Sequence, residues 1–149
     1  VTGVQTCALP IYSNFVSHAS LMNLLAQKMK PQRDGTIAVI SSVAGDRGKQ
    51  SNYAYGAAQA GKSTFTDGLR NRLFPFNVHV VTFRLGFVDS PMTKDFKKGP
   101  LWAKSAHIAA DIVTSIDKKK DNVYLPFFWR FIMLIIKSIP ERIFKTLKM

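Results

Sequence analysis

Apolar residues recur along this chain with two periods, one helical and one strand-like. Helical spacing predicts an amphipathic helix over roughly residues 13–30. Its apolar positions are Phe15, Ala19, Met22, Leu25, Ala26 and Met29. Pro31 to Gly35 is predicted to be a loop. The nearly continuous apolar run Thr36–Ser41 is rich in β-branched residues, which predicts a short strand buried on both faces.

The same alternation continues toward the C-terminus. Asn52 to Phe74 reads as a long helix rich in Ala and Gly, which Pro75 ends. Val78–Arg84 and Val123–Leu125 are predicted strands. Between them, Ser105–Lys118 is a predicted helix whose apolar side carries Ile108, Ile112, Val113 and Ile116. Strands separated by helices of this length imply right-handed crossovers, so we predict an α/β fold with a parallel sheet.

Composition narrows the class of protein. The chain has 149 residues, of which 46% are hydrophobic and 20% charged, enough for one domain with a core. The single cysteine, Cys7, excludes an internal disulfide framework and fits a reducing cytoplasm. The net charge of +12 indicates either a polyanionic partner or a solvated basic surface. Since the charges are dispersed without a recognition motif, we expect no nucleic-acid binding. The three histidines lack metal-ligand spacing, so we expect no metal site.

Two residues of the central segment suit carbonyl chemistry. Ser42 ends the first predicted strand, and Tyr55 lies at the start of the following helix. A tyrosine hydroxyl within about 3 Å of a carbonyl oxygen can supply it with a proton. Its unperturbed pKa is about 10, so a nearby positive charge is needed to favour the phenolate. A strand-end serine and a helical tyrosine are also common in purely structural roles.

The spacing of Ser42 and Tyr55, with Gly45 and Gly48 between them and Ala-Ala-x-Ala-Gly after the tyrosine, closely resembles the short-chain dehydrogenase/reductase family. The family signature is a strand-end Ser followed by Tyr-x-x-x-Lys. The resemblance covers about residues 13–125 and implies the C-terminal part of a Rossmann-like doubly wound parallel sheet, its last three strands with flanking helices. It implies that Ser42 orients a substrate carbonyl and that Tyr55 is the general acid. Asn14 falls near a family asparagine that positions a water molecule.

Gln59 departs from the family pattern, because it stands where the family has its lysine. The family lysine lowers the pKa of the tyrosine and holds the nicotinamide ribose. Glutamine can bond a ribose hydroxyl, but it is neutral. Lys62 lies seven residues after Tyr55, about 10 Å along a helix axis, which is too far for it to take over. The resemblance therefore implies that the reaction is severely impaired in this chain.

A second family element follows the strand that ends at Arg84. The run Leu-Gly-Phe-Val-Asp-Ser-Pro-Met-Thr resembles the Pro-Gly-x-Val-x-Thr-x-Met segment that cups the nicotinamide, with Leu85 in place of the proline. A plain strand-to-helix loop is the alternative. The resemblance implies contacts with NAD or NADP from Tyr55, Gln59, Leu85, Gly86, Val88 and Ser90. A single base change converts Lys to Gln, and another converts Pro to Leu. Either divergence or sequencing error therefore explains these departures.

The start of the chain does not fit the family. Residues 1–11 lack a clear period, are interrupted by Pro10 and resemble translated sequencing-adapter read-through, so we expect a non-native leader. Residues 12–125 are then the C-terminal half of the family domain. The glycine-rich phosphate loop and the ribose selector would belong to a preceding half. We therefore expect this fragment not to bind the cofactor by itself, and the choice between NAD and NADP stays open. The first strand would also expose an aggregation-prone edge.

The tail, residues 126–149, is aromatic, aliphatic and basic. Its longest uncharged run, Phe131 to Ile136, is too short to span a bilayer. Such a segment suits a membrane interface, and the competing interpretation is a helix that packs on the domain or on a subunit partner.

The tail, with Ser-Ser-Val-Ala-Gly-Asp-Arg and Gly-Phe-Val-Asp-Ser-Pro-Met-Thr, resembles one branch of the family, the 2-keto reductases of decaprenylphosphoryl-pentose. That resemblance implies NAD(P)H-dependent reduction of a ketone on a lipid-linked polyprenyl-phosphate sugar. It implies a cytoplasmic protein at the inner face of the membrane, and a homo-oligomer paired through the helices that flank the serine strand. The alternative is a non-catalytic, membrane-associated scaffold, which Gln59 and Leu85 would fit.

Overall fold

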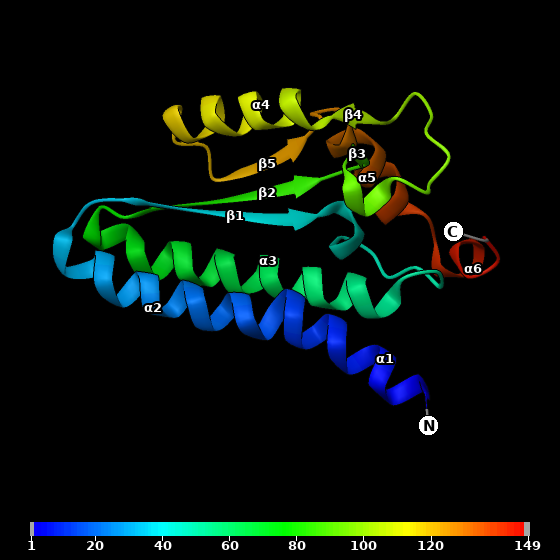
Figure 1. The fold of residues 1–149 in the computed structure, drawn as a ribbon, viewed down its shortest axis with the longest axis horizontal. Helices are drawn as coiled ribbons and strands as arrows, with labels where there is room; N and C mark the ends of the chain where they lie inside the picture. Colours follow the sequence, from blue (N-terminus) through cyan, green and yellow to red (C-terminus); the bar gives the residue numbers. More distant parts are fainter. Residues whose placement is uncertain (1, 148–149) are drawn as a thin grey trace.

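The computed structural model describes the backbone of residues 2–147 and the side chains of residues 7–147. Its centre is a parallel sheet of three strands, β1 (Thr36–Ser42), β2 (His79–Leu85) and β5 (Asn122–Leu125), in the order β1-β2-β5 (Figure 1). The predicted α/β class and parallel pairing are confirmed.

Helices cover the two faces of the sheet unequally. Helices α2 (Ser17–Gln32) and α3 (Tyr53–Leu73) lie together on one face, while α4 (Ser105–Asp117) lies on the other (Figure 1). The first layer of core contains Met22, Ala26, Ile37, Val39, Leu69, Leu73, Val78 and Val80. The second contains Val81, Phe83, Ile108, Val123 and Leu125. Successive residues of β2 serve opposite layers, as the pleat of a strand requires.

Two burial predictions are wrong. The strand β1 was expected to be buried on both faces, yet burial alternates along it: Val39 is 5% exposed and Ile40 is 53% exposed. The reason is that α4 packs against β2 and β5, which leaves the second face of β1 uncovered at the edge of the sheet. In α4 itself, Ile108 is buried, but Val113 is 58% exposed rather than facing the sheet.

The N-terminal segment differs from its prediction. Residues expected to lack a helical period form α1 (Thr2–Ile11), and a π-helical turn, η1 (Tyr12–Val16), joins it to α2. Val1 lies outside the described residues. The α1 helix packs against α3. At the other end, α2 runs through Pro31 to Gln32, where the predicted loop should have begun. Arg33 stops it in the left-handed region at φ 55°.

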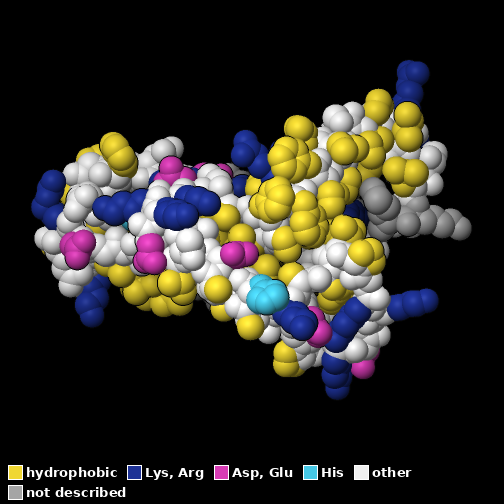
Figure 2. Space-filling model, turned by 90° about the horizontal axis from the view of Figure 1, so that it is seen from above, with side chains coloured by type: hydrophobic (Ala, Val, Ile, Leu, Met, Phe, Trp, Pro, Cys, Tyr) yellow, Lys and Arg dark blue, Asp and Glu magenta, His cyan; other side chains and the backbone are white. Residues whose placement is uncertain are grey.

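The remaining elements are short. Single 3-10 turns are η2 (Val43–Gly45), η3 (Phe74–Phe76) and η4 (Pro91–Thr93). The two-residue strands β3 (Val88–Asp89) and β4 (Ala103–Lys104) pair in parallel. The tail folds into α5 (Trp129–Ser138) and α6 (Glu141–Phe144); its last residues, Lys148 and Met149, lie outside the described part. Seen from above, many exposed hydrophobic side chains gather on the side of the molecule that carries the tail (Figure 2). None of the described helices is both long and apolar enough to cross a membrane.

Backbone contact between η2 and α3 fixes the carboxyl end of β1. A Cβ added to Gly45 would lie 2.7 Å from the backbone nitrogen of Ala60, and one added to Gly56 would lie 2.8 Å from the carbonyl oxygen of Ala44. Both positions therefore require glycine, and the turn after Ser42 lies directly on the helix that carries Tyr55.

We expect Gly45→Ala to destabilise the fold by about 1–3 kcal/mol, because the added methyl group must push two backbones apart. The matched control is Gly68→Ala in α3, the helix that Gly45 contacts, where nothing lies within 4 Å of the added carbon. That change should stabilise by roughly 0.5–1 kcal/mol. Urea unfolding followed by circular dichroism measures both, and a neutral Gly45→Ala would contradict the close contact.

A buried polar cluster holds the loop beyond η2 to the sheet. The hydroxyl of Tyr124 on β5 donates to Asp46 at 2.6 Å, and the same carboxylate pairs with Arg84 on β2 at 3.2 Å. Burial, and then the hydrogen bond to Asp46, raises the pKa of Tyr124 to about 12. Its neutral form is therefore favoured in the folded chain.

Tyr124→Phe should lower the free energy of unfolding at pH 8 by roughly 1–2 kcal/mol, because a hydrogen bond to a charged group is lost. The hydroxyl stabilises fully below pH 10, the tyrosine pKa of an unfolded chain. Between pH 10 and about 12 the unfolded state releases this proton while the native state keeps it, so the stabilisation declines. The difference in free energy of unfolding between wild type and Tyr124→Phe should therefore become smaller over that pH range. Exposed Tyr12→Phe is the control, and a gap independent of pH would contradict the assignment.

Candidate active site

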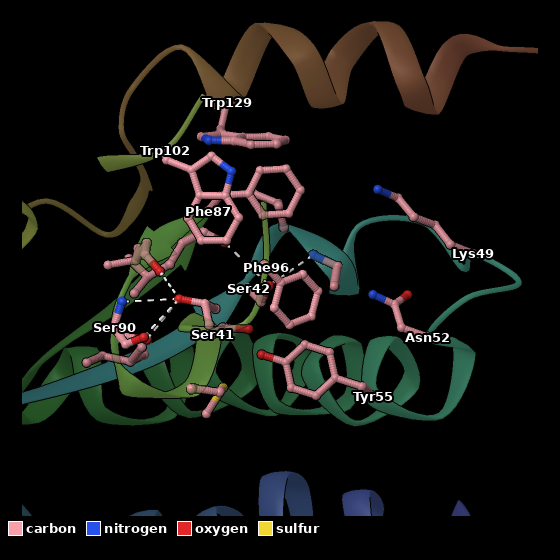
Figure 3. A pocket seen from close by; sticks show the side chains of 18 residues that line it. Ser41, Ser42, Lys49, Asn52, Tyr55, Phe87, Ser90, Phe96, Trp102 and Trp129 are labelled. Atoms are coloured by element: carbon pink, nitrogen blue, oxygen red, sulfur yellow. Dashed lines mark hydrogen bonds between the residues drawn. The ribbon is translucent and has the colours of Figure 1, made fainter. Parts of the chain in front are cut away.

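A pocket of about 530 Å³ opens at the carboxyl ends of β1 and β2, where ligands bind in open α/β sheets. The structure brings to this pocket most of the residues singled out from the sequence (Figure 3). These are Ser42, Tyr55, Leu85, Gly86, Val88 and Ser90. Asn14 and Gln59 do not line it.

Ser42 is the last residue of β1 and the N-cap of η2. Its hydroxyl accepts a hydrogen bond from the backbone N–H of Ala44 at 3.2 Å and donates to the carbonyl oxygen of Leu85 at 3.3 Å. Tyr55 comes from the first turn of α3, and Figure 3 shows its hydroxyl directed toward the strand end that carries Ser42. A carbonyl group bound between the two hydroxyls could accept a hydrogen bond from each.

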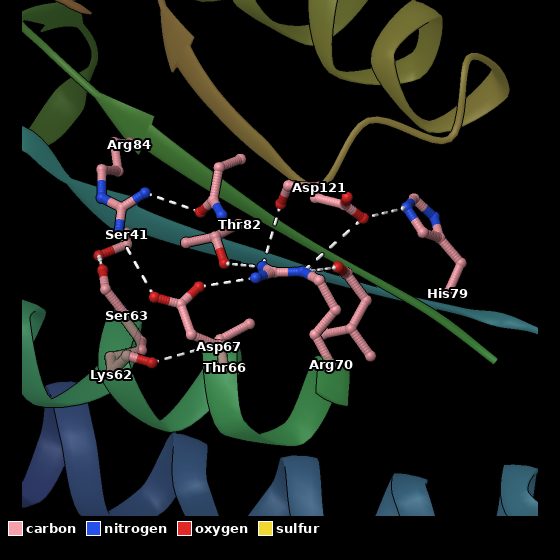
Figure 4. Close-up of polar contacts among 12 residues, drawn as sticks. Ser41, Lys62, Ser63, Thr66, Asp67, Arg70, His79, Thr82, Arg84 and Asp121 are labelled. Carbon is pink, nitrogen blue, oxygen red and sulfur yellow. Dashed lines mark hydrogen bonds and ion pairs between the residues drawn. The ribbon is translucent and has the colours of Figure 1, made fainter. Parts of the chain in front are cut away.

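Gln59 lies behind the pocket wall. It is 3% exposed, and its side-chain oxygen accepts a hydrogen bond from the hydroxyl of Ser41 at 3.3 Å. The Ser41 hydroxyl also bonds to that of Ser63 at 2.8 Å, on the α3 side of β1 (Figure 4). Ser41 lines the pocket beside Ser42, but its hydroxyl is bonded on the α3 side of the strand. The amide of Gln59 thus satisfies a buried polar cluster.

Two lysines near the site differ in position. Lys62 is buried, and desolvation lowers the pKa of its ammonium group. Burial lowers the pKa of His18 on α2, and the charge of Lys62 lowers it further. Lys62 does not line the pocket. Lys49, from the loop before α3, does line the pocket and brings a cation to its rim.

Asn14 lies in the π-helical turn η1, and its amide donates to the hydroxyl of Ser13 at 3.1 Å. The turn packs on α3 where the ring of Phe15 covers Gly61. Single π turns often occur at functional sites. The structure thus places Asn14 outside the pocket, on the helix layer beneath α3.

The segment after β2 forms a rigid wall opposite Tyr55. The hydroxyl of Thr93 donates to the carbonyl oxygen of Val88 at 2.8 Å and accepts from the backbone N–H of Ser90 at 3.1 Å. The bond from Ser90 is half of the capping box of η4, and the other half runs from the backbone N–H of Thr93 to the hydroxyl of Ser90. The pocket volume and the hydroxyl of Ser90 fit the nicotinamide end of a dinucleotide.

Aromatic side chains complete the pocket, and sequence reasoning missed them. Phe87 stacks on Trp102 with ring centroids 5.2 Å apart and meets the edge of Trp129 at 5.1 Å, while Phe96 lies beside Trp102. The buried indole N–H of Trp129 has no hydrogen-bond partner within the described part of the chain. It packs directly against Gly86, where an added Cβ would overlap the indole nitrogen. The four rings come from loops and from α5, so no local sequence pattern predicts that they meet.

Comparisons with known proteins agree with this geometry. The family model described as short chain dehydrogenase matches residues 6–100, well over half of the chain and including part of α1. An uncharacterized oxidoreductase of Mycobacterium tuberculosis is 30% identical over 137 residues, covering 92% of this chain and 55% of that protein. An uncharacterized oxidoreductase of Streptomyces coelicolor is 27% identical, covering 91% and 53%. The chain thus spans about half the length of the curated relatives it matches.

Solved structures show the same fold at low identity. A short chain dehydrogenase from Burkholderia cenocepacia in complex with NADP has a TM-score of 0.75 at 18% identity, over 83% of this chain and 51% of that one. A short-chain dehydrogenase from Sphingobium yanoikuyae in complex with NADPH has a TM-score of 0.74 at 17% identity, over 88% and 56%. With the family match, these findings mean that the chain belongs to the short chain dehydrogenase family of NAD(P)-dependent oxidoreductases.

Proposed function

We propose that this chain carries the substrate half of an NAD(P)H-dependent reductase that acts on a ketone of a lipid-linked polyprenyl-phosphate sugar. The observation that carries the proposal is the convergence of Ser42, Tyr55 and the segment Leu85–Ser90 on one pocket. None of these groups is a neighbour of the next in sequence, so their meeting is a property of the fold.

The chemistry assigned to the chain is the reduction of a carbonyl group. Its carbon receives a hydride, and its oxygen receives a proton. The Ser42 hydroxyl orients the carbonyl, and the Tyr55 hydroxyl donates the proton. Val88 and Ser90 would hold the nicotinamide, which supplies the hydride when bound. Gln59 contributes no charge, so nothing at the family lysine position lowers the barrier to proton release from Tyr55.

The walls of the pocket support an apolar, phosphate-bearing substrate. Phe87, Phe96, Trp102 and Met92 offer aromatic and apolar surface on which a sugar ring and an isoprenoid chain can pack. Lys49 offers a positive charge at the rim. The net charge of +12 adds a general attraction for a phosphorylated lipid.

A non-catalytic scaffold is the second candidate, and the position of Gln59 favours it. The residue is buried and hydrogen-bonded to Ser41, so the fold is satisfied without a lysine there. In either case we propose pairing of two copies through the helix layer of α2 and α3, where Leu21 and Leu24 are 56% and 62% exposed.

The test uses a full-length hybrid in which the N-terminal half of the Mycobacterium tuberculosis relative precedes this chain. Gln59→Lys should raise turnover by about 10²-fold or more, since general acid–base catalysis is worth roughly 10²–10⁴. In that background Tyr55→Phe should remove the gain. Tyr53→Phe, two residues away, 63% exposed and outside the pocket, is the matched control.

Oxidation of NADPH, followed by absorbance with a keto sugar on polyprenyl phosphate, measures the rate. A separate titration of NADPH fluorescence shows whether the hybrid binds the cofactor. Cofactor binding without turnover in Gln59→Lys would favour the scaffold.

A further inference from the structure

Helix α5 is apolar on the side that faces away from the domain as well as on the side that packs. Trp129 and Met133 are buried, at 3% and 1% exposed, against Val43. Phe131, Leu134 and Ile135 are 58%, 67% and 65% exposed. A surface helix normally presents polar residues outward, so this outer face calls for a covering partner.

Phe127, 72% exposed, extends the outer face at the start of the helix. The exposed residues 127, 131, 134 and 135 follow helical spacing and share one side. Figure 2 shows hydrophobic side chains gathered on the side of the molecule that carries the tail. We call these four residues the outer face of α5.

The charges around the outer face have one sign. Arg130 and Lys137 lie on α5, which contains no acidic residue, and Arg142 and Lys145 follow close behind. Glu141, the acidic residue of the described tail, pairs with Arg47 at 3.0 Å. Apolar side chains with a basic border match an anionic bilayer surface, where each basic residue adds attraction. A second copy of the chain would bring the same basic border and be repelled.

Arg47 binds the C-terminal end of α5 and so holds this helix against the domain. Its guanidinium donates to the carbonyl oxygens of Ile136 and Ile139 at the end of α5, the latter at 2.7 Å, and lies 3.6 Å from the ring centre of Phe144. The carbonyl oxygen of Ile136 also accepts from the backbone N–H of Ile139 at 3.4 Å, so Arg47 adds to the bonds that end the helix. Since Arg47 sits five residues after Ser42, the outer face is held in a fixed relation to the pocket.

A continuous row of aromatic rings joins the outer face to the pocket. Phe131 lies 6.4 Å from Phe127, Phe127 lies 6.4 Å from Phe128, and Phe128 lies 6.2 Å from Trp129. Trp129 then meets Phe87 inside the pocket at 5.1 Å. Since Trp129 is buried and lines the pocket, this packed row places the outer face close to the pocket.

We propose that the outer face of α5 docks on an anionic bilayer surface and that this docking brings the pocket close to the lipid part of the substrate. The second clause rests on the proposed function, whereas docking itself does not depend on catalysis. The side chains enter the interface of one leaflet only.

The test is sedimentation of the full chain with phosphatidylcholine vesicles that contain or lack phosphatidylglycerol. The chain should bind the anionic vesicles, and Ile135→Glu should weaken that binding by about tenfold or more, because an apolar contact becomes a repelled charge. Val113→Glu on α4 is the matched control, being β-branched and 58% exposed but away from the outer face. Its binding should stay within about twofold of wild type, and added salt should weaken all binding.

Equal binding by Ile135→Glu and Val113→Glu, or no binding by wild type, would overturn the proposal. Analytical ultracentrifugation without lipid tests whether a second copy of the chain covers the outer face instead. If the wild type is a dimer and Ile135→Glu is a monomer, the face is assigned to a second copy. Vesicle binding without turnover in the Gln59→Lys hybrid would contradict only the proposed function. Turnover without vesicle binding would contradict only the proposed docking surface.

Discussion

The site depends on one backbone–backbone contact, between η2 and α3. Gly45 and Gly56 allow the turn after β1 to lie against the helix, since a Cβ at either would overlap backbone atoms. That contact sets the distance between a strand residue and a helix residue that belong to different layers. Ser42 and Tyr55 therefore face one pocket. The polar groups of Asp46, Arg84 and Tyr124 then tie the continuing loop to the sheet.

Much of the fold follows from periodicity, and the failures have physical causes. The helix over Ser105–Asp117 and the parallel strands were visible because local spacing and crossover length carry the information. The open face of β1 was not, because exposure of Ile40 depends on which helix covers the strand. Nor was α1, whose contact with α3 outweighs a weak period. The pair Ser42 and Tyr55 could be predicted from spacing, but the aromatic wall joins Trp129 of α5 to Phe87, Phe96 and Trp102, which lie in irregular segments between residues 87 and 102.

Gln59 shows that the fold accommodates a neutral residue where the family has its lysine. Its side chain is buried and accepts a hydrogen bond from Ser41, so the position is satisfied structurally. The folded state does not require a charge at this position, and it is compatible with either of the two candidate functions.

The aromatic wall has a practical consequence. The chain contains two tryptophans, Trp102 and Trp129, and both line the same pocket. One indole is buried against Gly86 and the other is partly exposed on the opposite side of Phe87. Intrinsic tryptophan emission from this protein therefore originates entirely from the walls of the candidate site. Any ligand that enters changes the polarity around both emitters, so the molecule carries a built-in optical reporter of its own occupancy.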